Sequence, residues 1–350
     1  MTEIWKDIEG YEGLYQISNG GIMNNSTEDY YTDKTRISNS NIGWFLNKGP
    51  AFLHKMLTED VQEEKNPVLE RGTMIHEYLL QPEEFQKDYV VWDKSRPTTA
   101  QQEKFCQELA FTTEIEPNKA LENAYKASYI TKRLTDQTVL EKAVQLKNEL
   151  NDYIEYLRTR DVRKAISIWD VKMLNKIKEN IESHKLAKEL LNTNVKLSEA
   201  KEIHHEFHIN WEYRGVQCKS LLDSVTFDFE HHICTIMDLK TTQKLWHFEE
   251  SINTYDYCRQ LMYYTEAARW YLLHEKNENP ETWVFKWYII GIDTTGTYDI
   301  RVFKFDMVQI YSRQDVIIDA LDKISWHQQN NLWEHTKDYY DGDGSEKLNL

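Results

Sequence analysis

The segment MDLKTT, residues 237–242, places a carboxylate and an ammonium group two positions apart. In a β-strand, side chains two residues apart share a face, so Asp238 and Lys240 would point the same way. A carboxylate binds a hard divalent cation through oxygen, and a lysine can orient an attacking water or stabilise charge on a phosphate. The pair suits phosphodiester hydrolysis, although an isolated D-x-K tripeptide more often forms a surface ion pair.

A second carboxylate, Asp223, stands fifteen residues before Asp238 in the preceding alternating segment. Antiparallel partners in a hairpin can bring two carboxylates to one face, within reach of one metal ion. Apolar residues such as Leu221 and Val225 share the face of Asp223, and burying a carboxylate among them costs free energy unless it is paired or liganded. The alternative is an aspartate at a strand rim, satisfied by backbone amides.

Three polar side chains lie three and four residues apart in a long helical pattern that runs from about 248 to 274. Tyr257, Gln260 and Tyr264 therefore share one helix face and predict a lined cleft. The spacing alone favours the alternative, an amphipathic helix with tyrosines at its rim.

Two further residues could join a metal site. His76 belongs to a short helix expected between Gly72 and Pro82, and it becomes a ligand only if that helix reaches the aspartates. Glu206 alternates along the first strand, where such a residue is usually solvated. Zinc is disfavoured, because adjacent histidines on a strand point to opposite faces; the pairs concerned are His204, His205, His231 and His232.

The elements that would position these residues change in type along the chain. The first half reads as helices, with an N-capped helix from Ser38 to a stop at Gly49-Pro50 and a capping box at Ser167 and Asp170. Alternating strands follow between 203 and 242, then a helix over 248–274, strands over 283–292 and 298–305, and a helix over 307–330. This order predicts an α/β (α+β) fold with a central mixed sheet flanked by helices.

Three regions are expected: a short N-terminal module and linker over 1–36, a main domain over 37–335, and a polar tail over 336–350. The main domain would carry a helical insertion over about 100–192. Between Arg158 and Lys188 there are nine basic and four acidic residues, a candidate phosphate track or an ordinary solvated helix face.

Bulk composition excludes several classes of protein. The net charge of −16 argues against a protein that coats nucleic acid, while leaving room for a local basic track. The four cysteines form no CxxC pair, so neither a zinc ribbon nor an iron–sulfur cluster is expected. The N-terminal residues do not resemble a signal peptide and no long apolar run occurs, so we expect a cytoplasmic protein with no membrane partner.

Five segments together resemble the RecB-like branch of the PD-(D/E)xK nucleases, closest to the RecE-type exodeoxyribonuclease VIII group and related phage exonucleases. They are SNSNIGWFLNKGPAFLHKML, RGTMIHEYLLQPEEF, CKSLLD, IMDLKTT and YDYCRQLMYY, and they occur in the family's order over roughly 36–310. The last two are the most specific. The chain departs from the family at Leu221, where an arginine is usual.

The resemblance implies a role for each matching residue. His76, Asp223, Asp238 and the backbone carbonyl of Leu239 would hold the metal, and Lys240 would be the catalytic lysine. Gln260 and Tyr264 match the DNA-contacting helix, whose face Tyr257 extends. Glu206 would match an accessory acid on the first strand.

The family implies Mg²⁺-dependent hydrolysis, with Mn²⁺ as an alternative metal, that degrades DNA from the ends of a linear duplex. Phage recombination is the expected setting, with a single-strand annealing protein as partner, a homo-oligomeric ring and the host cytoplasm as location. The rivals are an endonuclease on the same fold and a catalytically silent DNA-binding scaffold. The N-terminal WKDIEGYEGLYQISNGG resembles a short module of HNH-type homing nucleases, where it is taken to associate with DNA.

Overall fold

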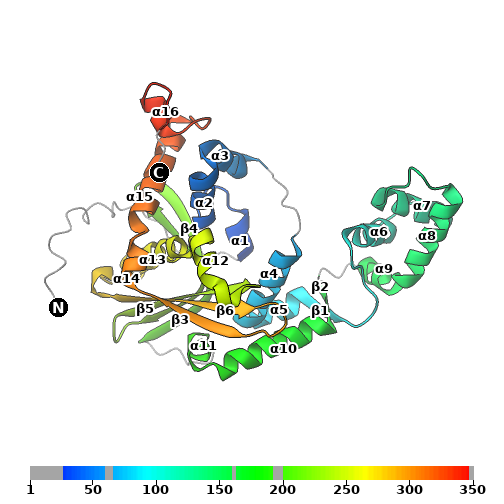
Figure 1. Ribbon diagram of the computed structural model, residues 1–350, viewed down its shortest axis with the longest axis horizontal. Helices are drawn as coiled ribbons and strands as arrows, with labels where there is room; N and C mark the ends of the chain where they lie inside the picture. Colours follow the sequence, from blue (N-terminus) through cyan, green and yellow to red (C-terminus); the bar gives the residue numbers. More distant parts are fainter. Residues whose placement is uncertain (1–26, 60–65, 160–162, 192–199, 347–350) are drawn as a thin grey trace. The chain divides into compact units, whose positions relative to one another are not determined.

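A computed structural model describes residues 27–59, 66–159, 163–191 and 200–346 (Figure 1). The chain divides into two compact units, which are described separately: Met1–Gln81 with Lys176–Leu350, and Pro82–Asn175. Most of the predicted N-terminal module, residues 1–26, lies outside the described residues.

The first unit is built on a five-stranded mixed sheet whose strands lie in sequence order. Its strands are β3 (Lys201–Tyr213), β4 (Val216–Asp228), β5 (Ile233–Thr242), β6 (Val284–Asp293) and β7 (Ile300–Phe305). Strands β5 and β6 are parallel, and the other neighbours are antiparallel. The parallel pair requires a crossover, which the helices between β5 and β6 provide. The α+β fold with a mixed central sheet is confirmed.

Helices cover this sheet, and α13 is the central one (Figure 1). It contacts β3, β4 and β5, and α2, α14 and α15 pack against it. Helix α4 contacts β4 and β5. The helices of this unit are α1 (Thr27–Thr32), α2 (Asn39–Lys48), α3 (Pro50–Thr58), α4 (Pro67–Leu80), α11 (Lys185–Leu190), α12 (Phe248–Tyr255), α13 (Tyr257–His274), α14 (Met307–Tyr311), α15 (Gln314–Asn330) and α16 (Lys337–Asp341), with 3-10 turns at Leu245–His247 and Pro280–Thr282.

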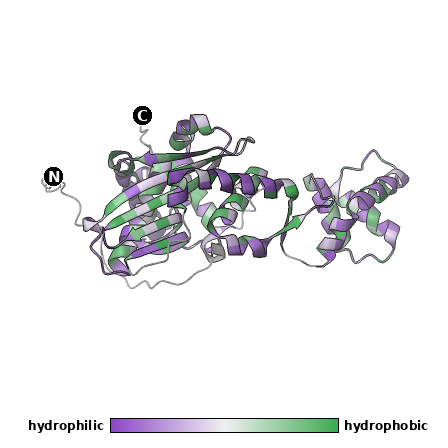
Figure 2. Cartoon of the chain, turned by 90° about the horizontal axis from the view of Figure 1, so that it is seen from below, coloured by the Kyte–Doolittle hydropathy of each residue, from purple (hydrophilic) through white to green (hydrophobic). Residues whose placement is uncertain are grey.

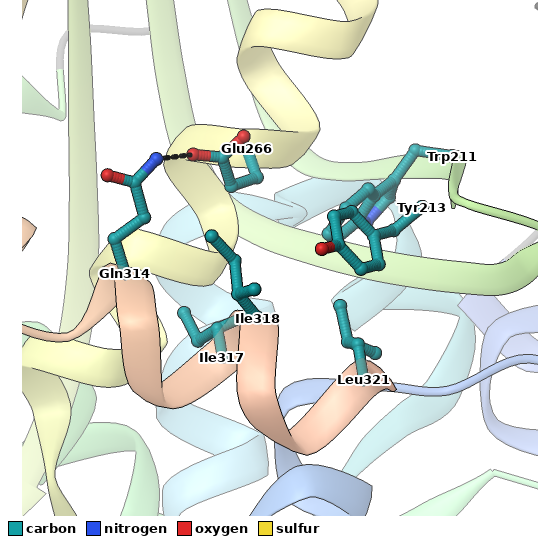
Figure 3. A pocket seen from close by; sticks show the side chains of 7 residues that line it. All are labelled: Trp211, Tyr213, Glu266, Gln314, Ile317, Ile318 and Leu321. Carbon is teal, nitrogen blue, oxygen red and sulfur yellow. Dashed lines mark hydrogen bonds between the residues drawn. The ribbon is translucent and has the colours of Figure 1, made fainter. Parts of the chain in front are cut away.

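The core lies between α13 and the sheet, and amphipathic helices close it from outside, each carrying both hydrophobic and hydrophilic residues (Figure 2). Figure 3 shows one part of this packing, where apolar residues of α15 face Trp211 and Tyr213 of β3. Above them, the Gln314 amide donates a hydrogen bond of 3.4 Å to Glu266 of α13. This hydrogen bond pairs two polar side chains at the edge of the apolar contact.

Several helices begin or end at the capping residues and glycine that the sequence predicted. Ser38 and Asn41 form a reciprocal capping box at the start of α2, and Gly49 ends that helix with φ 84°. A left-handed φ of this kind suits glycine, which has no Cβ to clash. Ser167 and Asp170 likewise cap each other across the start of α10 (Ile168–Ser183).

Other predicted bounds were wrong. Helix α4 begins at Pro67, with Asn66 as its cap, and Gly72 lies inside it. The helix predicted over 248–274 is two helices, because Asp256 adopts a left-handed φ of 48° and caps α13. The helix predicted over 307–330 also breaks, between α14 and α15. The predicted tail contains α16, which Thr336 caps.

The second unit contains a helical cluster and a two-stranded parallel sheet. Its core joins α6 (Ala100–Ala110), α7 (Pro117–Ser128), α8 (Asp136–Glu149) and α9 (Asn151–Arg158). Helix α5 (Pro82–Asp88) leads into β1 (Tyr89–Trp92), which pairs with β2 (Lys164–Ser167). The basic stretch from Arg158 to Lys188 is therefore not one helical track, because it contains β2, the whole of α10 and parts of α9 and α11. Among the described helices, none combines the length and apolar character needed to span a membrane.

Candidate active site

Strands β4 and β5 separate halfway along their length, and the candidate site lies at that point. Their ladder runs from the hairpin as far as the pair Ser224 and Met237. Beyond it, the chain at Ile37 takes the place beside β4, donating to Gln217 at 2.9 Å and accepting from Lys219 at 2.8 Å. Beyond Ser224 and Met237, β4 therefore pairs with the chain at Ile37 instead of with β5.

Asp223 and Asp238 occupy the first position beyond the last ladder pair. The Asp223 side chain accepts a hydrogen bond of 2.6 Å from the backbone N–H of Leu239, a bond that a ladder partner would otherwise make. Asp238 is 0% exposed and Asp223 is 8% exposed. The separation of the strands therefore places both carboxylates inside the protein and fixes one of them to the backbone of the other strand.

Glu206 joins this pair from the neighbouring strand. The register pairs His205 with Ser224 and Phe207 with Leu222, which puts Glu206 opposite Asp223. Residues directly opposite in an antiparallel pair point to the same face. Glu206 itself has a left-handed φ of 47°, which interrupts the ladder locally. Three carboxylates thus follow one another across β3, β4 and β5.

His76 reaches the same carboxylates from α4. Its Nδ1 lies 3.6 Å from Oδ2 of Asp223 and 3.9 Å from Oε1 of Glu206. Helix α4 comes this near because Gly72 packs on β5; a Cβ there would lie 3.3 Å from the Oγ1 of Thr241. Within the described ranges, His76, Glu206 and Asp223 form the one group whose ligand atoms all lie within 4.8 Å of one another. The adjacent histidine pairs considered for zinc are not in that group.

Burial and neighbouring charges shift the pKa values of the acids and of the histidine in this site. Burial, together with the charges of Asp223 and Asp238, raises the pKa of Glu206 to about 9. Burial also raises the pKa of Asp223, and that of Asp238 to about 6. In contrast, burial and the charge of Lys240 lower the pKa of His76 to about 4, so the imidazole is neutral near pH 7. A neutral imidazole is the form that binds a metal ion.

Lys240 shares a face with Asp238, as the period of a strand predicts. Its Nζ lies 2.5 Å from Oδ2 of Asp238. Although burial disfavours its charged form, Asp238 and Asp223 raise the pKa of this lysine. Neither Asp238 oxygen has a donor with hydrogen-bond geometry among the described residues, even though both are buried. Close acids that one lysine cannot neutralise, beside a neutral imidazole, fit a divalent cation.

The predicted face of the long helix also reaches the site. Tyr257 is the first residue of α13, and the Lys240 Nζ lies 5.3 Å from the centre of its ring. The Gln260 amide donates 2.8 Å to the hydroxyl of Tyr264. Tyr264 is buried, and its pKa is raised well above the usual value by burial and by the charges of Asp238 and Asp223. Its burial leaves Gln260 and Tyr257 as the more accessible members of this face.

Sequence reasoning missed two residues near the acids, Glu77 and Lys219. Glu77 adds its charge to the repulsion on Glu206, and its position directly after His76 was the available signal. Lys219 donates to the carbonyls of Tyr30, at 2.5 Å, and Asp33, which ties α1 to β4. No sequence signal pointed to that contact. Leu221, where the resembling family has arginine, is buried opposite His208.

A protein-family model agrees with this geometry. A family described as a PDDEXK-like domain of unknown function, DUF3799, matches residues 38–338, and the NUMOD4 motif matches residues 3–42. A crystal structure from Eubacterium rectale, named "Putative exonuclease", is 13% identical with a TM-score of 0.48, covering 94% of this chain and 96% of its own. None of the curated proteins matches the chain. Since the first match spans most of the chain, the protein belongs to the PDDEXK-like DUF3799 family, within the PD-(D/E)xK nuclease superfamily.

Proposed function

We propose that the protein is a metal-dependent deoxyribonuclease whose site comprises His76, Glu206, Asp223, Asp238 and Lys240. One observation carries the proposal: two carboxylates and a neutral imidazole lie within reach of one ion where β4 and β5 separate, and the pair of Asp238 and Lys240 lies beside them. A structural ion pair would balance its charges, whereas here burial and the neighbouring acids raise the pKa of Glu206 and of Asp238. That excess of acid supports a bound divalent cation.

His76, Glu206, Asp223 and Asp238 would hold the cation, together with the backbone carbonyl of Leu239. A bound Mg²⁺ would polarise the phosphate and lower the pKa of a bound water. Lys240 remains protonated, so it serves as a charge and hydrogen-bond donor toward phosphate or water rather than as a base. Asp238 positions that ammonium group through their contact. The imidazole ligand makes Mn²⁺ an effective alternative to Mg²⁺.

The substrate we propose is linear duplex DNA, degraded from its ends. Gln260 and Tyr257 would contact the strand on the α13 side, and Tyr264 would hold the Gln260 amide in place. The resemblance to RecE-type enzymes supports this mode, and with it a role in phage recombination beside a single-strand annealing protein, in an oligomeric ring. Two alternatives stand beside this proposal. One is an endonuclease on the same fold, which would not need a DNA end, and the other is a DNA-binding scaffold without catalytic activity.

The test compares end-labelled linear duplex with covalently closed circles, in Mg²⁺ and in EDTA. We expect degradation of the linear DNA in Mg²⁺ alone, with closed circles spared. Closed circles cut at a similar rate would establish the endonuclease instead. Cleavage that persists in excess EDTA would contradict the metal site, and a protein that cuts no DNA in Mg²⁺ or in Mn²⁺ would be the scaffold.

A further inference from the structure

A cleft of about 580 Å³ opens beside Tyr257 at the carboxyl ends of the parallel strands β5 and β6. In open α/β sheets, ligands commonly bind outside the carboxyl ends of the parallel strands, and the parallel pair β5 and β6 has such an end here. Four segments line the cleft: the residues that end and follow β5, the first turns of α4, helix α12 with the start of α13, and Thr294 after β6. The cleft thus adjoins the site without sharing its acids.

A row of aromatic rings connects the proposed catalytic lysine with the open cleft. The Lys240 ammonium lies 5.3 Å from the ring centre of Tyr257, whose ring stacks on Tyr255 at 5.8 Å and 24°. Tyr257 is supported from the core by Phe248, at 5.9 Å. Tyr255 is 63% exposed, although it is a large ring whose burial would be favourable. Its accessible face can therefore stack on a further planar ring.

The charged lining of the cleft favours an anion, in contrast to the whole chain. The lining contains two basic residues, Arg71 and Lys244, and one acid, Glu250. Lys244 and Glu250 approach to 3.5 Å, but both are well exposed, so their attraction is weak. Within the described residues, Arg71 makes no ion pair. Side-chain hydroxyls of Thr241, Ser251 and other residues supply additional donors for phosphate oxygens.

We propose that this cleft binds unpaired nucleotides of one DNA strand next to the phosphate being cut. Tyr255 would stack on a base, and Arg71 would contact a neighbouring phosphate. Clefts of about 300–1,000 Å³ enclose single small ligands, so this one takes about one or two nucleotides rather than a duplex. The proposal rests on the nuclease function above and makes its substrate specific: the enzyme separates the strands at the end it degrades.

The test measures DNA binding with Ca²⁺ replacing Mg²⁺, so that binding is read without cleavage. Fluorescence anisotropy compares a duplex that ends in a short single-stranded overhang with a blunt duplex. We expect the parent protein to prefer the overhang. Tyr255→Ala should weaken overhang binding about tenfold, as expected for one lost base stack, and Tyr255→Phe should retain it. Phe111→Ala removes another exposed ring, in the second unit, and should change nothing.

Arg71→Ala gives a second, independent readout. Loss of one phosphate contact to a single strand should lower the slope of log binding constant against log salt by about 0.7. Melting temperature monitors folding, which these exposed positions should leave unchanged. If the parent cleaves DNA while Tyr255→Ala binds the overhang as tightly as Tyr255→Phe, the cleft proposal is overturned and the nuclease stands. A parent that neither cleaves nor binds DNA overturns both.

Discussion

Asp223 holds the backbone of Leu239, because its Oδ2 accepts the Leu239 N–H at 2.6 Å. This bond joins β4 and β5 at the point where their own ladder has ended. It fixes one carboxylate beside the backbone of Leu239, whose carbonyl we propose as a metal ligand. The other Asp223 oxygen would then serve the proposed cation. The site is therefore formed by a gap in the sheet as much as by its side chains.

Replacement of Lys240 by alanine should separate chemistry from folding. Its loss removes a charge that stabilises the transition state, and such a deletion costs about 10²–10³ in rate. Single-turnover cleavage of a labelled duplex measures it. Lys240→Arg should not restore the rate, since a planar guanidinium cannot replace a compact ammonium group. Lys304→Ala, at an exposed lysine on β7, serves as the matched control. A folded Lys240→Ala as fast as the parent would remove this lysine from the mechanism.

Glu206 should make metal stabilisation depend on pH. Without a metal ion, the pKa of Glu206 is raised from the usual 4.5 to about 9. Protonation of Glu206 therefore stabilises the folded protein fully below pH 4.5, and this stabilisation is lost as the pH rises through 9. His76 acts in the opposite sense, losing stability below pH 6.5, and Asp238 has titrated by about pH 6. Between pH 7 and 9, the titration of Glu206 therefore dominates the change in stability.

We thus expect the rise in melting temperature on adding Mg²⁺ to grow between pH 7 and 9, because the cation replaces the lost proton. In chelator, the melting temperature of Glu206→Gln should change less with pH over this range than that of the parent. Its rise in melting temperature on adding Mg²⁺ should also be smaller. A Mg²⁺ response of equal size at both pH values in the parent would show that Glu206 does not bind the metal.

Gly72 should be sensitive to size, since a Cβ there would lie 3.3 Å from Thr241 Oγ1. Gly72→Ala can be accommodated by a small shift of that hydroxyl and gains up to about 1 kcal/mol of helix propensity. Gly72→Val should move α4 away from β5 and carry His76 away from Asp223. We expect a several-fold higher Mg²⁺ requirement for cleavage in the valine variant alone. Equal metal titrations for both variants would contradict this positioning.

The hydrogen bond between Gln260 and Tyr264 should matter for DNA rather than for metal. Gln260→Ala and Tyr264→Phe both remove it, and the second leaves a buried tyrosine pocket without a polar group. At limiting DNA, both variants should cleave more slowly, with unchanged Mg²⁺ titrations. Cleavage at the parent rate would mean that this face of α13 is only structural.

Lys219 should act as a structural clamp on α1. Lys219→Met keeps the length of the side chain but leaves the Tyr30 and Asp33 carbonyls without their donor. An unmade hydrogen bond of this kind costs about 1–3 kcal/mol. We expect a melting temperature several degrees lower, and faster proteolysis near residue 33. Lys304→Met is the control. Normal stability with a large loss of DNA binding would instead indicate a phosphate contact.

The sequence alone determined the features that depend on neighbours along the chain. Alternation by two placed Asp238 and Lys240 on one face, and their 2.5 Å contact agrees. Ser38, Gly49 and Ser167 marked helix ends, because caps form between residues a few positions apart. The order of helices and strands was enough for the α+β class and for the mixed sheet.

The tertiary structure decided which distant residues meet. Glu206 faces Asp223 only through the register of β3 on β4, and a register is set by packing across the sheet rather than by either strand alone. His76 reaches the acids because α4 lies close against β5 at Gly72. The sequence predicted that this helix starts at Gly72, but Gly72 lies inside α4. The cleft beside Lys240 needs the break at Asp256, which turns one expected helix into two. Each of these depends on contacts between segments far apart in the chain, which no local pattern encodes.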